Sequence, residues 1–257
     1  MSVVMDKYDA LEEETSLKHF SLLFGLSQAV GALAVILVAV WMGNYDGGFA
    51  WTEKPDNQFH YHPLFMTIGL IFLYGEAMLV YRVFRHEAKK FTKLLHLILH
   101  SMVAIFFIVA LKAVFDSHNN NVKDGKPAPI RNLYTLHSWV GFASVLAFCL
   151  QYATAFATFF WPGLSMPVRS WLMPYHRVLG TGIFVSAVAA ALMGISERYA
   201  WHVAPECKEG CSQEMVVNFL GLAIFVYAVL ILYLVLNPNY RRRPLPQEES
   251  LQQLTAD

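Results

Sequence analysis

The sequence predicts an all-α fold, a bundle of six transmembrane helices. Hydrophobic residues make up 56% of the 257 residues and charged residues only 15%, which is unusual for a soluble domain. Six apolar runs reach the roughly 20 residues that a helix needs to cross the hydrocarbon core of a bilayer. Because backbone groups find no water there, helix is the expected form of each run. The expected spans are Ser21–Met42, Tyr61–Val83, Leu94–Phe115, Leu133–Phe160, Trp171–Glu197 and Glu214–Leu236.

These spans divide the chain into a tail (residues 1–20), a six-helix domain (21–236) and a second tail (237–257). Six spans place both termini on one side of the membrane, and Lys and Arg concentrate on the cytosolic side of membrane proteins. The side with the termini holds Lys7, Lys18, Arg82, Arg85, Lys89, Lys90, Lys93, Arg169, Arg241, Arg242 and Arg243. The other side holds Lys54, Lys123, Lys126, Arg131, Arg198 and Lys208. We therefore expect both termini in the cytosol, and an acidic N-terminal region that is not a cleavable signal peptide.

Three cysteines are present, and two of them share the last non-cytosolic loop. Cys207 and Cys211 are four residues apart, so a disulfide is plausible if that compartment is oxidising, with two exposed thiols as the alternative. A zinc site at this pair is not expected, because few further ligands lie nearby. Cys149 lies within the fourth span and is expected to be a small core residue.

Four histidines lie within the spans at two matched depths. His62 and His137 come near the start of two spans that both descend from the non-cytosolic side. His96 and His176 come near the start of two spans that both rise from the cytosolic side. Imidazole is costly in hydrocarbon unless it is bound. The spacing therefore predicts two buried sites of two histidines each, at levels roughly 20 Å apart.

Haem is the ligand that this donor set fits best. Zinc would require three or four protein ligands, and neither pair has a thiolate or carboxylate beside it. Two imidazoles supply both axial ligands of a haem, which limits the iron mainly to electron transfer. A lone histidine would more often be a hydrogen-bonded core residue or part of a proton relay. His100, one turn beyond His96, is either a second candidate for the inner site or a packing neighbour, and His60 is expected to be solvated.

The residues around these histidines resemble the cytochrome b561 family. The stretches that carry the resemblance are Phe59–Pro63, Val80–Lys89, Lys93–His96, Ala113–His118, Asn132–Trp139 and Met173–His176. The match covers about residues 20–240, with the order and spacing of the histidines. The loop Arg85–Lys89 is closer to the chromaffin-granule type of the family than to the duodenal ferric reductase type.

The resemblance implies a homodimer of six-helix chains with two haem b groups in the four-helix core of spans two to five. It implies an ascorbate-dependent transmembrane oxidoreductase that takes an electron from cytosolic ascorbate. The acceptor would be monodehydroascorbate, or ferric or cupric ions, on the lumenal or extracellular side. The membrane would be that of a secretory vesicle, an endolysosomal compartment or the cell surface, and no nucleic-acid partner is expected.

The resemblance also implies roles for individual residues. His62 and His137 would hold the outer haem, and His96 and His176 the inner haem. The other implied site residues are Lys89, Lys93 and Arg169 for cytosolic ascorbate, His118 and Phe115 for the outer substrate pocket, and Arg82 and Asn132 at the haem edges. Ascorbate is an anion at neutral pH, so cations are expected to raise its local concentration. The alternative for these lysines is binding of anionic lipid headgroups.

Three charged residues depart from the family pattern. Glu76 lies nearer the cytosolic end of its span and Lys112 nearer the outer end, so the two are not expected to pair. Glu76 either packs against a neighbouring helix or belongs to a proton route, and Lys112 is expected to extend outward. Arg177 is expected to reach the headgroups or an inner haem propionate.

The alternative function is a proton- or zinc-coupled transporter that uses its membrane histidines without haem. The lack of Gly/Pro-broken helices in matching halves of the chain argues against it.

Overall fold

The computed structural model describes residue 17 and residues 19–51, 53–207 and 210–242. Within this part of the chain, six helical segments are long and apolar enough to cross a membrane, which confirms the six-helix, all-α prediction. Residues 1–16, 18 and 243–257 of the two expected tails lie outside the described residues.

Most spans consist of more than one helical element. The first is α2 (Phe20–Val40) with the π-helical turn η1 (Trp41–Tyr45), and the second is α3 (Pro55–Phe59), α4 (Tyr61–Met66), η2 (Thr67–Leu73) and α5 (Tyr74–Val83). The third is α6 (Lys89–Asn119), the fourth α7 (Leu136–Ala155) with η3 (Phe156–Phe160), the fifth α8 (Met166–Arg198) with η4 (Tyr199–Val203), and the sixth α9 (Ser212–Leu236). The short pieces β1 (Val122–Lys123), β2 (Lys126–Pro127) and η5 (Pro238–Tyr240) complete the fold.

Two helices begin well before the apolar runs that predict them. α6 starts five residues before Leu94, and α8 starts five residues before Trp171. Polar turns at a membrane surface can stay helical because water and headgroups satisfy their side chains. A proline in the first turn favours the start of α8, since its fixed φ suits that position and no hydrogen bond is lost. α7 starts at a capping box, in which Thr135 and Ser138 satisfy each other's backbone amides.

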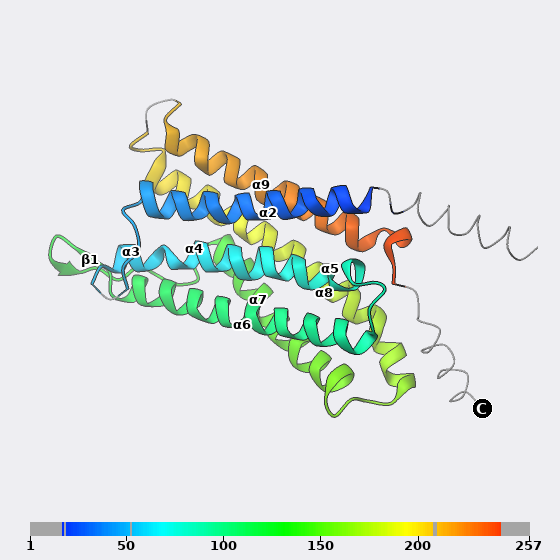
Figure 1. Ribbon diagram of the computed structural model, residues 1–257. Coiled ribbons are helices and arrows are strands. Elements are labelled where there is room, and N and C mark those ends of the chain that lie inside the picture. Colours follow the sequence, from blue (N-terminus) through cyan, green and yellow to red (C-terminus); the bar gives the residue numbers. More distant parts are fainter. Residues whose placement is uncertain (1–16, 18, 52, 208–209, 243–257) are drawn as a thin grey trace, which may run out of the picture.

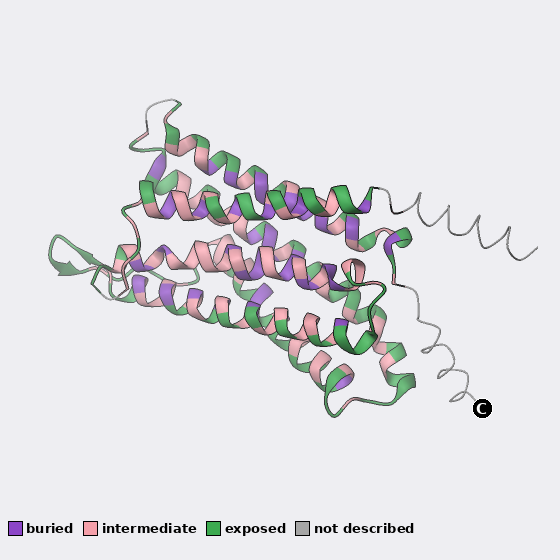
Figure 2. Cartoon of the chain, viewed as in Figure 1, coloured by how far each residue is buried: buried purple, intermediate pink, exposed green. Residues whose placement is uncertain are grey.

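The helices pack in neighbouring pairs (Figure 1). α2 lies beside α9, α7 beside α8, and α4 and α5 along α6. η2 contacts α2, α6 and α8, so the second span lies at the centre of the bundle. Buried residues face the interior of the bundle and exposed residues cover its outer faces (Figure 2). Exposed apolar side chains are expected there, because lipid rather than water surrounds a membrane bundle.

The two ends of the bundle differ in charge. One end, called the basic end, carries both termini of the described chain and the α5–α6 and α7–α8 connections (Figure 1). Its described cations are Arg82, Arg85, Lys89, Lys90, Lys93, Arg169, Arg177, Arg241 and Arg242. The other end, called the hairpin end, carries the β1–β2 hairpin and, among the described residues, Lys54, Lys112, Lys123, Lys126, Arg131 and Arg198.

A polar contact links the outer helices α2 and α9 to the central span. Glu76 on α5 accepts hydrogen bonds from Gln28 Nε2 at 2.8 Å and from Tyr227 Oη at 3.1 Å. Lys112 pairs instead with Asp116, one turn further along α6, at 2.6 Å. The prediction that Glu76 and Lys112 do not pair is therefore confirmed.

A partly buried ion pair closes the hairpin end. The Arg198 guanidinium donates to Asp46 Oδ2 from Nη2 at 2.7 Å and from Nε at 3.1 Å. The prediction that His60 is solvated is wrong, since this side chain lies beside the pair and its residue is only 1% exposed. His60 Nδ1 donates to the carbonyl of Gly48 at 2.5 Å, so a loop contact that the sequence does not reveal buries the ring.

Two of the three cysteines are joined in a disulfide, and the third is free. Cys207 and Cys211 form a disulfide, which confirms the more specific of the two expectations for this loop. The prediction that Cys149 is a core residue is wrong, because its side chain is exposed on the outer face of α7. A membrane span is apolar on all sides, so its hydropathy does not indicate which face points inward.

Candidate metal centres

The outer pair of histidines joins the first turn of α7 to α4. The rings of His62 and His137 have centroids 6.2 Å apart and planes at 84°. Each Nδ1 donates to a backbone carbonyl of a neighbouring helix. His62 donates to Ala110 on α6 at 3.3 Å, and His137 donates to Ala190 on α8 at 2.7 Å. Both rings are thus held by the helices around them.

The inner pair joins α6 to α8 near the basic end. The rings of His96 and His176 have centroids 6.2 Å apart and planes at 75°. His96 Nδ1 donates to the carbonyl of Ala77 on α5 at 2.8 Å. His100 lies against His96, with centroids 4.5 Å apart, and also against Tyr74 at 4.8 Å. The rings of His96 and His176 thus lie close together with steeply inclined planes, and His100 lies beside the first.

The spacing of each pair fits one metal ion between two imidazoles. A ring whose Nδ1 donates a proton keeps its lone pair on Nε2, the nitrogen that binds metal. With a metal–nitrogen distance of about 2.0 Å and a ring centre about 1.1 Å behind each nitrogen, two ligands on opposite sides of a metal have centroids about 6 Å apart. Both pairs meet this value.

The donor set fits haem and does not fit zinc. Zinc requires three or four protein ligands. Within the described residues, the one group of three or more potential metal ligands is Cys207, Cys211 and Glu214, which contains none of these histidines. Haem requires only two protein ligands to its iron, and each pair of imidazoles could provide them.

Two helices fix the separation of the two levels. On α6, His96 belongs to the inner pair, and the carbonyl that holds His62 lies fourteen residues later, at Ala110. On α8, His176 belongs to the inner pair, and Ala190, which holds His137, again lies fourteen residues later. Fourteen residues of α-helix rise about 21 Å, close to the expected separation of roughly 20 Å.

A glycine makes room for the outer pair. A Cβ atom at Gly194 on α8 would lie 2.7 Å from Cε1 and 2.9 Å from Nδ1 of His137. The imidazole therefore packs directly on the backbone of α8, one turn beyond the carbonyl that it bonds.

Cations gather beside the inner pair at the basic end. Lys93 Nζ donates to the carbonyl of Phe159 at 3.0 Å, and the Phe159 ring lies 5.4 Å from that of His176. The charges that act on Lys93 are those of Arg169, Lys89 and Lys90, all cations. Arg169 Nε is buried and has no hydrogen-bond partner among the described residues. A cavity of about 80 Å³ lined by Phe159 and His176 lies beside this group. The expected ascorbate residues thus form a positively charged group next to His176.

The residues expected at the outer acceptor lie at the hairpin end. His118 Nδ1 donates to Asn132 Oδ1 at 2.9 Å, and Asn132 Nδ2 donates to Asn119 Oδ1 at 2.9 Å. The His118 ring stacks on Phe59, with centroids 6.3 Å apart and planes at 10°. Phe59 lies in turn 5.9 Å from His62. His118 is therefore connected to the outer pair through an aromatic ring.

The structure places Phe115, Arg82 and Arg177 as follows. Phe115 is half-buried on α6, and no ring contact joins it to His118 in this part of the chain. The Arg82 guanidinium donates to the carbonyl of Val235 at the end of α9. Arg177 is exposed. The haem-edge roles of Arg82 and Asn132 stay predictions, and the structure shows Asn132 bonded to His118.

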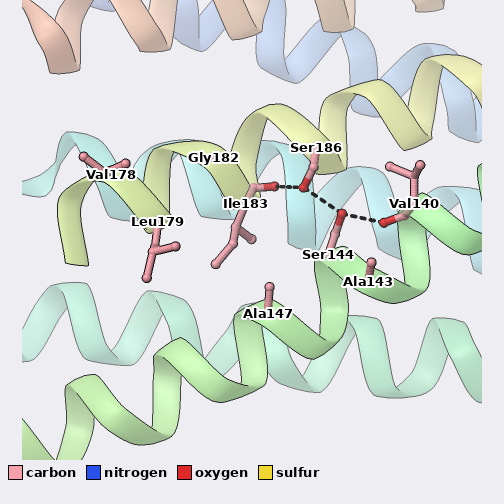
Figure 3. Close-up of a pocket in the computed structure, with 9 residues that line it drawn as sticks. All are labelled: Val140, Ala143, Ser144, Ala147, Val178, Leu179, Gly182, Ile183 and Ser186. Carbon is pink, nitrogen blue, oxygen red and sulfur yellow. Dashed lines mark hydrogen bonds between the residues drawn. The ribbon is translucent and has the colours of Figure 1, made fainter. Parts of the chain in front are cut away.

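A separate groove lies away from the four histidines. It measures about 440 Å³, runs between α7 and α8, and is crossed by a hydrogen bond of 2.8 Å between Ser144 and Ser186 (Figure 3). Small residues such as Ala143, Ala147 and Gly182 form much of its wall. No histidine lines it, so it is not part of either metal centre.

The sequence did not single out Phe59 or Gln151, although both contact site residues. Phe59 lies between His62 and His118. Gln151 Nε2 donates to the carbonyl of His176 at 3.2 Å. A signal for Gln151 existed, because it follows His137 by fourteen residues, the spacing that connects the two levels on α6 and α8.

Comparisons with known proteins identify the family of this chain. The family model for eukaryotic cytochrome b561 matches residues 61–202, which include all four histidines. A Caenorhabditis elegans protein named putative transmembrane ascorbate-dependent reductase CYB561 homolog is 48% identical over 100% of this chain and 98% of its own length. The human transmembrane ascorbate-dependent reductase CYB561 is 38% identical over 88% of this chain and 86% of its own length. The Xenopus laevis plasma membrane ascorbate-dependent reductase CYBRD1 is 34% identical over 93% of this chain and 81% of its own length. The chain therefore belongs to the eukaryotic cytochrome b561 family.

Proposed function

We propose that this protein is a transmembrane ascorbate-dependent reductase with two haem b groups. His62 and His137 would hold one haem near the hairpin end, and His96 and His176 the other near the basic end. The observation that carries the proposal is the equal spacing of 6.2 Å in both pairs. The names of the relatives from worm, human and frog, all ascorbate-dependent reductases, support it.

When bound, each haem supplies an iron that accepts and gives up one electron. The chain positions the iron ligands, excludes water and binds the two substrates. An ascorbate monoanion loses one electron and one proton at the basic end and becomes monodehydroascorbate. An acceptor at the hairpin end gains that electron, so a ferric ion becomes ferrous.

The donor side is assigned to the basic end by its charge. Lys93 lies three residues before His96 and Arg169 seven residues before His176, so each cation shares a helix face with an inner ligand. The buried Nε of Arg169, which has no hydrogen-bond partner within the described part of the chain, is suited to an anion. The excess of cations at this end also supports a cytosolic location, with both termini in the cytosol.

The acceptor side is assigned to His118. Because Asn132 Nδ2 donates to Asn119, its Oδ1 is the atom that meets His118, and His118 Nδ1 must carry the proton. Nε2 then keeps a lone pair that can bind a ferric or cupric ion or face monodehydroascorbate. The homodimer and the membrane in which the protein resides follow from the family resemblance alone and stay predictions.

Visible spectroscopy and ascorbate kinetics test the proposal. The reduced protein should show the α band of a low-spin b-type cytochrome, and a preparation without this band would refute haem binding and favour the transporter alternative. Changing both Lys93 and Arg169 to Ala should slow reduction by ascorbate and leave reduction by dithionite intact. The matched control changes Lys123 and Lys126, exposed at the hairpin end, to Ala. Equal ascorbate rates in both double variants would refute the donor site.

A further inference from the structure

Three of the four imidazoles donate Nδ1–H to a backbone carbonyl, and the fourth does not. Ala110, Ala190 and Ala77 accept from His62, His137 and His96, respectively. The imidazole of His176 has no hydrogen-bond partner among the described residues. A metal-binding histidine almost always donates its second nitrogen to an acceptor, which fixes the tautomer and the ring. Within the described residues, the inner pair therefore lacks the hydrogen-bond acceptor that would orient the His176 ring.

The register of α7 against α8 brings Gln151 to this ligand. His137 on α7 bonds the carbonyl of Ala190 on α8. Fourteen residues further along α7, Gln151 Nε2 bonds the carbonyl of His176, which lies fourteen residues before Ala190 on α8. The amide of Gln151 thus repeats at the inner level the position that the His137 imidazole has at the outer level.

Glycines on α8 provide the space at both positions. A Cβ at Gly180 would lie 2.8 Å from Gln151 Nε2, just as one at Gly194 would lie 2.7 Å from the His137 ring. Gly180 is also held in place by Tyr74, whose Oη donates to its carbonyl at 2.8 Å. The close approach of Gln151 to α8 is therefore built into the backbone.

The oxygen of the same amide is unsatisfied. Gln151 Oε1 is buried and has no hydrogen-bond partner among the described residues. Gln151 and His176 line the same cavity of about 80 Å³. Among the described residues, Gln151 Oε1 thus lacks a donor and the imidazole of His176 lacks an acceptor. Each group leaves one hydrogen bond unmade, which is costly for buried polar atoms.

We propose that Gln151 is the positioning residue of the inner pair, and that its side-chain oxygen accepts the Nδ1–H of His176. It would do for His176 what Ala77, Ala110 and Ala190 do for the other three ligands. The inference rests on the proposed haem ligation. It adds that the inner centre is tuned by a side chain, whereas the outer centre is held by backbone carbonyls alone.

The consequence is a specific effect on one redox potential. An acceptor on Nδ1–H makes the imidazole a stronger electron donor, which favours the ferric state. Gln151→Leu removes the acceptor at similar volume, so the midpoint potential of the inner centre should rise. Gln151→Glu provides a stronger acceptor, so that potential should fall. Loss of such an interaction commonly costs tenfold or more, and a tenfold change in a one-electron equilibrium is about 59 mV.

Spectroelectrochemical titration of the purified haem-loaded protein, together with low-temperature EPR of the two ferric centres, measures both effects. The outer centre serves as an internal control and should not change. Gly180→Ala should displace the amide and reproduce the shift of Gln151→Leu. Gly182→Ala, on the same helix with nothing within 4 Å of the added carbon, should not. Gln58→Leu applies the same substitution near the hairpin end and should leave the inner potential unchanged.

The outcomes separate this inference from the proposed function. A wild-type protein without two low-spin centres refutes the haem ligation itself. Two normal centres, with an inner potential and EPR signal that neither Gln151→Leu nor Gly180→Ala changes, refute only the role of Gln151. If Gln151→Leu fails to retain the inner centre, Gln151→Glu decides. Recovery of that centre with a lowered potential supports the inference, and failure to recover it overturns it.

Discussion

Gly194 provides the sharpest test of the outer centre. In a Gly194→Ala variant, the new methyl group would lie 2.7 Å from Cε1 of His137. Non-bonded carbons are comfortable at about 3.5 Å or more, so the ring must move by roughly 0.8 Å. The hydrogen bond from His137 Nδ1 to Ala190 measures 2.7 Å and would lengthen to about 3.5 Å, beyond the usual limit. The change thus displaces the ligand and breaks the bond that orients it.

We expect the outer centre to bind haem 10- to 100-fold more weakly in this variant, or about 1.4–2.8 kcal/mol. The inner centre should be unaffected, because Gly194 lies about 27 Å along α8 from His176. The assay is haem content per chain and the rate of haem loss to excess apomyoglobin, with EPR to identify the centre that is lost. Gly182→Ala is the matched control. An outer centre with normal content, loss rate and EPR signal would refute the reasoning.

Three further predictions concern the pairing of the ligands, the ion pair and the disulfide. Single changes of His62, His137, His96 and His176 to Ala should each remove one centre, with the first two removing the same one, and any other grouping in the EPR spectra contradicts the pairing. Asp46→Asn leaves the Arg198 guanidinium, whose side chain is only 17% exposed, without its carboxylate, and should cost about 3–5 kcal/mol of stability. Thermal unfolding in detergent measures this cost, and a loss no greater than that of the exposed-site variant Asp124→Asn speaks against it. After unfolding and alkylation without reductant, mass spectrometry should find one alkylated cysteine per chain, and three if the protein is reduced first. Changing Cys207 and Cys211 to Ser should lower the free energy of unfolding by about 2 kcal/mol. Three alkylated cysteines without reductant would show that the bond is absent.

The sequence predicts the six spans and the depths of the four histidines, because both depend on quantities that are local in the chain. Hydropathy identifies a span, and a residue count places a histidine within it. The ends of α6 and α8 are less predictable, since the polar turns that extend them carry no apolar signal. The outward face of Cys149 is also hidden, because a lipid-facing surface is as apolar as a protein interior.

The surroundings of the site depend on contacts between distant residues and could not be predicted in the same way. Asp46 and Arg198 are 152 residues apart, and the buried His60 ring lies beside their ion pair. The carbonyls that accept from three of the four histidines belong to alanines, whose side chains indicate nothing about hydrogen bonding. These contacts follow from helix register, which one sequence alone does not reveal.

The fourteen-residue interval on α6 and α8 restricts how the length of such a chain can change. One residue inserted between His96 and Ala110 would turn the outer part of α6 by about 100° and lift it by about 1.5 Å. The carbonyl that holds His62 would then face another direction, while His96 stayed in place. An insertion between the two levels on α6 or α8 would therefore move each carbonyl away from the histidine that donates to it. The gap between the centres is set by helix pitch and stays constant in bilayers of different thickness.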